Sequence, residues 1–196
     1  MNVAIIPAKG GSVRLPRKNI RNFAGSPIIA YSIRAAVESD LFSSVIASTD
    51  DDEIAAIAYR AGASVAMRPK SLDQVGTQEV AHHALTTHLD RVKIDLACVI
   101  YATVPMLTVA DLRAGYRALP GHEFAMSVGT EPLRDAGMFY FGRAAAFRER
   151  LPLIAPHTAM VPMPEERICD INTAEDWCRA ERMYLANLPK EKCATS

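Results

Sequence analysis

Short apolar runs alternate along this chain with longer stretches in which apolar residues recur at helical spacing, and this alternation strongly limits the fold. The first run, NVAIIP, is apolar at successive positions, which is typical of a parallel strand covered on both faces. We expect strands at residues 2–7, 44–48, 63–67, 96–101, 124–128 and 137–141. The pattern predicts a three-layer α/β fold with a mostly parallel, Rossmann-like sheet between two layers of helices.

The helical stretches carry signals at their ends. Pro27 suits the first turn of a helix, and Gly62 suits the left-handed residue that ends the next helix. We expect side-chain caps at the other helix starts, namely Asp50 with Glu53, Thr77, Thr108 with Asp111, and Thr173 with Asp176. These caps place the helix N-termini directly after the loops that leave the strands.

The length of the chain limits the number of domains. With 196 residues, 49% of them hydrophobic, it can bury one good core and is short for two. We predict a single domain over residues 1–188 and a flexible tail over residues 189–196. No stretch approaches the roughly 18 uninterrupted apolar residues of a membrane span, so we expect a cytoplasmic protein without a membrane partner. The four cysteines lack metal-ligand spacing, and we expect buried or incidental thiols.

Charge is balanced overall but unevenly distributed. The 22 basic and 22 acidic residues cancel, which gives no reason to expect binding to nucleic acid. No acidic residue precedes Glu38, whereas basic side chains gather in AKGGSVRLPRKN, residues 8–19. A local cationic site in a neutral protein predicts a small anionic ligand rather than a polyanion.

The same segment directly follows the first expected strand, at the end of the sheet where open α/β folds bind ligands. Glycines at positions 10 and 11 allow a sharp turn that can bring backbone N–H groups against phosphate oxygens. The segment adds the hydroxyl of Ser12 and four cations: Lys9, Arg14, Arg17 and Lys18. Neither the P-loop pattern nor GxGxxG is present. Phosphate binding is the preferred interpretation, and a solvated basic loop or an RNA-contacting arm stays open.

These residues resemble a known family. AIIPAKGGSVRLPRKN is similar to the opening signature of the acylneuraminate and pseudaminic acid cytidylyltransferases, and the similarity continues through IAYSIRAA, VIASTDDDEIAAIAYRAGASV, CVIYATVPML, DAGMFYFG and DINTAEDW. YATVP, DAGMFYFG and DINTAEDW resemble the pseudaminic acid branch. The resemblance implies a fold of the nucleotide-diphospho-sugar transferase type. It also implies an enzyme that couples CTP to a sialic-like sugar acid with Mg²⁺, releasing pyrophosphate.

The resemblance implies roles for individual residues as well. Its catalytic positions fall on Lys9, Arg14, Lys18 and Asp170. Its nucleotide contacts fall on Ala8, Gly10, Gly11, Ser12, Asn19, Arg68, Tyr101 and Thr103. Its sugar contacts fall on Asp135 and Met138, and its Mg²⁺ ligands on Asp170 and Asn172. The other candidates have structural roles: we expect residues 50–52 to complement a helix N-terminus, and His82, His83 and His88 to be solvated or at the edge of the core.

The sequence departs from the family pattern at several places. Val13 stands where the related signature has a lysine, and Asn172 stands where a second acid is usual. Met138 replaces a residue that is commonly polar. Residues 129–134 replace several tens of residues that, in relatives, build a dimerisation lobe, which puts a homodimer in doubt.

Two classes of function therefore remain. The first is a Mg²⁺-dependent cytidylyltransferase acting on pseudaminic acid or a relative. The second is a catalytically impaired descendant that binds nucleotide in a binding or regulatory role. The departures at Val13 and Asn172 and the short segment 129–134 motivate the second.

Overall fold

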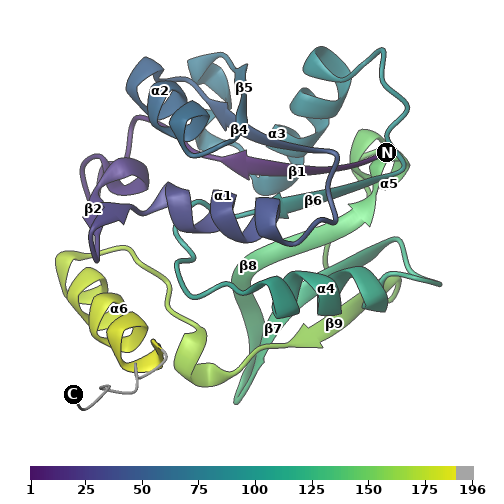
Figure 1. Cartoon of the computed structure of the whole chain (residues 1–196). Coiled ribbons are helices and arrows are strands. Elements are labelled where there is room, and N and C mark those ends of the chain that lie inside the picture. Colours follow the sequence, from purple (N-terminus) through teal and green to yellow (C-terminus); the bar gives the residue numbers. More distant parts are fainter. Residues whose placement is uncertain (189–196) are drawn as a thin grey trace, which may run out of the picture.

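The structure, a computed structural model, describes residues 1–188. Its centre is a seven-stranded sheet (Figure 1) made of β1 (Asn2–Pro7), β4 (Ser44–Thr49), β5 (Ser64–Met67), β6 (Leu96–Ile100), β7 (Phe124–Thr130), β8 (Leu133–Arg143) and β9 (Thr158–Pro162). The strand order is β5-β4-β1-β6-β8-β7-β9, and β8 alone among these strands runs antiparallel to its neighbours. The predicted α/β fold with a mostly parallel sheet is confirmed. The predicted tail, residues 189–196, lies outside the described residues.

Helices cover both faces of this sheet, which gives the three predicted layers. One face carries α1 (Ile29–Glu38), α2 (Asp52–Arg60) and α4 (Val109–Ala118). The other face carries α3 (Thr77–His83), a π-helical turn (Ala84–His88) and α5 (Ala144–Arg148). Short 3-10 turns lie at Lys18–Ile20, Lys70–Gln74 and Glu165–Arg167.

The last helix, α6 (Ala174–Asn187), packs outside the main layers (Figure 1). It covers the small hairpin formed by β2 (Asn22–Phe23) and β3 (Ser26–Pro27). Trp177 and Phe23 meet edge to face, with ring centroids 5.4 Å apart, and both are buried. This cluster ties the end of the described chain to the loop that follows β1.

The burial of strand β1 shows why this sheet needs helices on both of its faces. Val3, Ala4, Ile5 and Ile6 are all 0% exposed. Ala4 and Ile6 belong to the core on the α1 face, and Val3 and Ile5 to the core on the α3 face. Because successive side chains point to opposite faces, an uninterrupted apolar run suits only a strand with helices on both sides.

Two helix starts match the predicted caps, and three do not. Thr108 with Asp111 and Thr173 with Asp176 form complete capping boxes. At α2, however, Asp51 is the cap and accepts a hydrogen bond from the Ile54 N–H group, so the prediction of Asp50 is wrong. Helix α3 starts with Thr77 itself after Gly76, and its N-cap makes no side-chain hydrogen bond. Helix α1 begins at Ile29, because Pro27 is already used in β3.

Three of the four cysteines lie within the described residues. Cys98 is buried, and burial raises the pKa of its thiol well above the usual value. Cys98, Cys169 and Cys178 are free thiols, and Cys193 lies outside the described residues. None of the helices within residues 1–188 has the length and apolar character needed to cross a membrane.

We predict that Gly115→Ala, inside α4, destabilises the protein. Replacing a mid-helix glycine by alanine normally stabilises by roughly 0.5–1 kcal/mol. Here a Cβ would lie 2.6 Å from Phe139 Cε2 and 2.8 Å from Phe141 Cδ2, and both rings are buried. We therefore expect a loss of about 1–3 kcal/mol in the free energy of unfolding, measured by urea denaturation. Arg117→Ala, on the exposed side of α4, is the control, and a stabilised Gly115→Ala protein would contradict the packing argument.

Candidate active site

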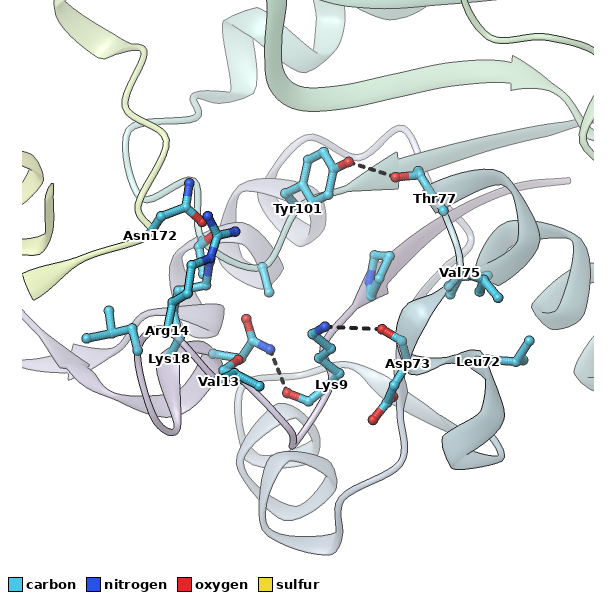
Figure 2. A pocket seen from close by; sticks show the side chains of 18 of the residues that line it. Lys9, Val13, Arg14, Lys18, Leu72, Asp73, Val75, Thr77, Tyr101 and Asn172 are labelled. Carbon is cyan, nitrogen blue, oxygen red and sulfur yellow. Dashed lines mark hydrogen bonds between the residues drawn. The ribbon is translucent and has the colours of Figure 1, made fainter.

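A cavity of about 500 Å³ opens at the carboxyl ends of the central parallel strands (Figure 2). This is the edge of the sheet at which open α/β folds bind ligands. The loop after β1, the segment between β5 and α3, and the loop after β6 form its walls. The predicted site residues that line it are Lys9, Ser12, Arg14, Lys18, Asn19, Arg68, Tyr101, Thr103 and Asn172.

Three predicted nucleotide contacts are not among the residues that line this cavity: Ala8, Gly10 and Gly11. The Gly10 N–H group donates to Asp50 Oδ1 at 2.8 Å, so the expectation that it faces a phosphate is corrected. A Cβ on Gly10 would lie 2.7 Å from Asp51 Oδ2 and 2.9 Å from Asp51 Cβ. Glycine is needed here because the loop approaches the N-terminus of α2 too closely to leave room for a Cβ.

The acidic residues at the start of α2 hold the loop in place, as their expected structural role requires. Asp51 accepts a hydrogen bond from the Ile54 N–H group at 2.9 Å and two from Arg17, at 2.6 and 3.1 Å. The hydrogen bond from Arg17 lowers the pKa of the Asp51 carboxyl, and burial opposes this effect. Arg17 has a left-handed backbone, with φ of 57°, and also pairs with Glu53. It is therefore a clamp on α2 and not one of the cations that line the cavity.

Lys9 and Lys18 do line the cavity, and each is anchored on a distant backbone carbonyl group. Lys9 Nζ donates to Asp73 O at 3.1 Å, and Lys18 Nζ donates to Ile171 O at 2.7 Å. Burial lowers the pKa of Lys18, the nearby Asp170 carboxylate opposes this, and the charges of Arg14 and Lys9 lower it further. The mutual repulsion of these cations favours an anion between them.

Asn19 and Arg68 support the cavity wall. Asn19 Nδ2 donates to Lys9 O at 2.9 Å, which holds the lysine backbone. Arg68 is 7% exposed, and its guanidinium donates to Ser48 O at 3.0 Å and to Asp73 Oδ1 at 3.3 Å. Within the described part of the chain, its Nε is buried without a hydrogen-bond partner.

Several lining residues carry no recognisable signal in the sequence. Leu72, Val75 and Val80 give the β5–α3 side an apolar surface, and Asp73 lies between the two basic side chains that bind it. Thr77, expected as a helix cap, lines the cavity and shares a hydrogen bond of 2.7 Å with the Tyr101 hydroxyl (Figure 2). Only the tertiary fold brings these residues to the loop after β1.

Of the two predicted metal ligands, Asn172 is among the residues that line the cavity and Asp170 is not. Asn172 Nδ2 donates to Asp170 Oδ2 at 2.6 Å. Thr173 and Asp176 form the cap of α6, so the exposed Asp170 is not needed for that purpose. Among residues 1–188, no group of three or more His, Cys, Asp or Glu could hold a metal ion. One carboxylate and one amide oxygen nevertheless fit Mg²⁺, which commonly takes one or two protein oxygens and completes its shell with water and phosphate.

The two predicted sugar contacts differ in exposure. Asp135 is exposed near the start of β8, and its carboxylate accepts hydrogen bonds from the Gly137 N–H group and the Tyr140 hydroxyl. Met138 is 2% exposed and belongs to the core, so a direct sugar contact by this side chain is contradicted. An apolar residue at position 138 is explained by packing in the core.

The predicted structural roles of the histidines agree with their contacts. His82 Nδ1 lies 2.9 Å from Arg148 O, and His88 Nε2 lies 2.8 Å from Met67 O. His83 packs against His88, with ring centroids 5.5 Å apart, and burial lowers its pKa. The three rings thus make structural contacts that link α3 and the π-helical turn after it to α5 and β5.

Comparison with known proteins gives consistent results. A family sequence model described as Cytidylyltransferase matches residues 3–139. The chain is 32% identical over 225 residues to pseudaminic acid cytidylyltransferase of Campylobacter jejuni subsp. jejuni, across 95% of this chain and 97% of that one. It is 30% identical over 218 residues to N-acylneuraminate cytidylyltransferase A of Danio rerio, across 93% of this chain and 50% of that one.

A solved structure shares the fold. CMP:2-keto-3-deoxy-manno-octonic acid synthetase complexed with CTP matches with a TM-score of 0.76 and 16% identity, covering 95% of this chain and 99% of that one. At this identity the match supports the fold alone.

The Campylobacter protein has residues that this chain lacks, and the β7–β8 segment of this chain is short. The match extends over 225 residues, which is 29 more than the 196 residues of this chain, so the relative has residues without a counterpart here. In the structure, β7 and β8 form one hairpin in which Thr130 already pairs with Leu133. No extra lobe is inserted at this hairpin.

We predict that Asp51→Ala destabilises the protein by about 1–2.5 kcal/mol at pH 7, because it removes a helix cap and a partly exposed ion pair. The lowered pKa of Asp51 means that its ionic contribution is present above about pH 4 and is lost as the pH falls through the folded-state value. Urea denaturation at pH 7 and near pH 3 should therefore show a smaller difference from wild type at the lower pH. Glu38→Ala, which removes an exposed acid of α1 outside this contact, is the control, and a loss that does not change with pH would contradict the ionic contribution.

Proposed function

The chain belongs to the cytidylyltransferase family, and from this premise we propose that it transfers a CMP group from CTP to a nonulosonic acid, pseudaminic acid or a close relative. Pyrophosphate is the second product. The observation that carries this proposal is the 32% identity to a pseudaminic acid cytidylyltransferase over nearly the whole length of both chains. The cationic cavity agrees with it, because the cluster of Lys9, Arg14 and Lys18 favours a small, multiply charged anion and a triphosphate is one.

The reaction suits the residues that line the cavity. A hydroxyl of the sugar acid forms a bond to the α-phosphorus of CTP, and the bond from that phosphorus to the pyrophosphate oxygen breaks. Phosphoryl-type transfer needs positioning and charge neutralisation more than covalent participation by the protein. Lys9, Arg14 and Lys18 would bind the triphosphate oxygens and stabilise the charge that develops on pyrophosphate.

A divalent cation, Mg²⁺ in this proposal, would be held by Asp170 and Asn172, and when bound it adds positive charge next to the phosphates. Asn172 contributes no formal charge, so Asp170 carries the ionic part of this site. The predicted nucleotide contacts of Ser12, Asn19, Arg68, Tyr101 and Thr103 are retained in the proposal, because all five line the cavity.

The geometry favours a small nucleotide over RNA. Arg17 is occupied by Asp51 and Glu53, and the ammonium groups of Lys9 and Lys18 are held inside the cavity by carbonyl oxygens. An RNA-binding arm would instead offer several free cations on an open surface.

The proposed function is tested by incubating the purified protein with CTP, Mg²⁺ and either pseudaminic acid or N-acetylneuraminic acid. We expect pyrophosphate release and a CMP-sugar product with at least one acid, and loss of both when EDTA removes the metal. CTP binding without pyrophosphate release would instead support the impaired, nucleotide-binding descendant. In that protein the departures at Val13 and Asn172 would have removed catalysis.

The metal assignment predicts that Asp170→Asn requires roughly 10-fold or more additional Mg²⁺ for half-maximal turnover, because the only formal charge among the two ligands is lost. Asp170 is exposed, so the thermal unfolding midpoint should stay close to that of wild type. Glu175→Gln, an exposed acid in the first turn of α6, is the matched control. An unchanged Mg²⁺ requirement in Asp170→Asn would exclude this residue as the ligand.

The phosphate assignment predicts that Lys18→Ala weakens CTP binding by about 1.5–3 kcal/mol, the range for a charge-assisted contact. Isothermal titration measures the affinity, and thermal unfolding checks that loss of the bond to Ile171 O leaves the fold intact. Lys70→Ala removes an exposed lysine that does not line the cavity and should bind CTP as wild type does. Equal affinities of the two variants would count against the assignment.

A further inference from the structure

An acidic side chain lies in the wall of the cationic cavity. Of the described residues that line the cavity, one is an acid, Asp73, and four are basic, namely Lys9, Arg14, Lys18 and Arg68. Asp73 belongs to the 3-10 turn Lys70–Gln74, between β5 and α3. A carboxylate repels any anion that lies near it, so an acid in a site for a triphosphate requires an explanation.

Two contacts place Asp73 against the loop after β1. A Cβ on Gly11 would lie 3.6 Å from Asp73 Oδ2, which is an ordinary contact distance. Lys9 Nζ donates to the backbone oxygen of the same aspartate at 3.1 Å. Figure 2 shows Lys9 and Asp73 joined by this hydrogen bond. The acid therefore lies beside the part of the loop that carries a cation assigned to the triphosphate.

Arg68 gives a structural reason for an acid at this position. Its side chain is 3% exposed, and its Nη2 lies 3.3 Å from Asp73 Oδ1. Its Nη1 donates to Ser48 O at 3.0 Å. A buried cation that loses its partner destabilises a protein strongly. If pairing were the whole role of Asp73, removal of its charge would disturb Arg68 and weaken nucleotide binding.

The charge of Asp73 has the opposite effect on the ligand. The side chain is 15% exposed, so water and salt screen its charge less than they would at the surface. Its repulsion of a nucleotide grows with the negative charge of that nucleotide. The repulsion is therefore largest for free CTP. It is smaller for CTP whose phosphates hold a divalent cation, because the cation cancels part of their charge.

We propose that Asp73 is a specificity-determining residue, whose carboxylate makes the cavity select a triphosphate complexed with a divalent cation over the free triphosphate. This inference rests on the proposed function, because it takes CTP as the ligand. The selection has a use in the reaction. Free CTP lacks the added positive charge that stabilises departing pyrophosphate, and Asp73 keeps it from occupying the site unproductively.

The first test is Asp73→Asn, which keeps the size of the side chain and an oxygen that can accept from Arg68 but removes the charge. Isothermal titration measures CTP affinity in EDTA and in saturating Mg²⁺. We expect free CTP to bind about 5-fold more tightly or better, whereas affinity in Mg²⁺ changes by less than about 2-fold. Asp90→Asn removes an exposed acid that does not line the cavity and is the control, which should keep the wild-type preference.

The second test adds an acid to the same wall and leaves the pair of Arg68 and Asp73 in place. Val75 lines the cavity and is 37% exposed, so the fold should tolerate Val75→Asp. In EDTA we expect this variant to bind CTP about 5-fold more weakly than Val75→Asn, its uncharged control of the same size. This comparison tests the charge of the wall even if Asp73→Asn does not fold.

The results distinguish charge selection from a structural role. If Asp73→Asn binds CTP more weakly, and equally so with and without Mg²⁺, Asp73 only positions Arg68 and the proposal is overturned. Equal affinities of Val75→Asp and Val75→Asn in EDTA would overturn it as well.

The results also separate this inference from the proposed function. If wild type binds CTP with a preference for the Mg²⁺ complex that Asp73→Asn reduces, but releases no pyrophosphate with any nonulosonic acid, the proposed function fails and the selection stands. If wild type turns over and Asp73→Asn keeps the wild-type preference, only the selection fails.

Discussion

The close approach of the loop after β1 to the N-terminus of α2 determines the arrangement of the site. Gly10 can touch Asp51 only because it lacks a Cβ, and this contact lets Asp50 take the Gly10 amide and lets Arg17 pair with Asp51. The acids at the start of α2 are therefore paired with the Gly10 amide and with Arg17, one of the four cations of the loop. The remaining cations face the cavity, where their mutual repulsion makes an anionic ligand favourable.

Much of the fold could be predicted because it depends on local pattern. The apolar run of β1 requires cover on both faces, and the capping boxes at Thr108 and Thr173 involve neighbours only three residues away. Strand β9 could not be predicted in this way. It lies at the sheet edge with Met160 53% exposed, so its apolar pattern is weak, and its strand character comes from pairing with β7. The bulge that lets β8 extend back to Leu133 likewise depends on Ser127 of another strand.

The site was predictable to the extent that charge and glycine mark it. Lys9 and Lys18 stand out in a segment without acids, but their partners, the carbonyl groups of Asp73 and Ile171, are distant in sequence. The same holds for Thr77, which looks like a helix cap but bonds to Tyr101. Met138 shows the opposite error: the motif predicts a sugar contact at this position, whereas the side chain is buried in the core. The sequence pattern carries no information about contacts between segments that are distant along the chain.

The departures at Val13 and Asn172 change how the site would bind its ligands without removing it. Asn172 Nδ2 donates to Asp170 Oδ2, so in the proposed metal site the carbonyl oxygen of Asn172 and the other carboxylate oxygen of Asp170 would bind the cation, with a single formal charge between them. Val13 is 88% exposed beside Arg14, so this part of the cavity has one cation where the related signature offers two. Metal and triphosphate would each bind weakly alone, and each supplies the charge that the other lacks. Such coupling is reciprocal by thermodynamic linkage, so the proposed site would take up the metal and the nucleotide as a pair.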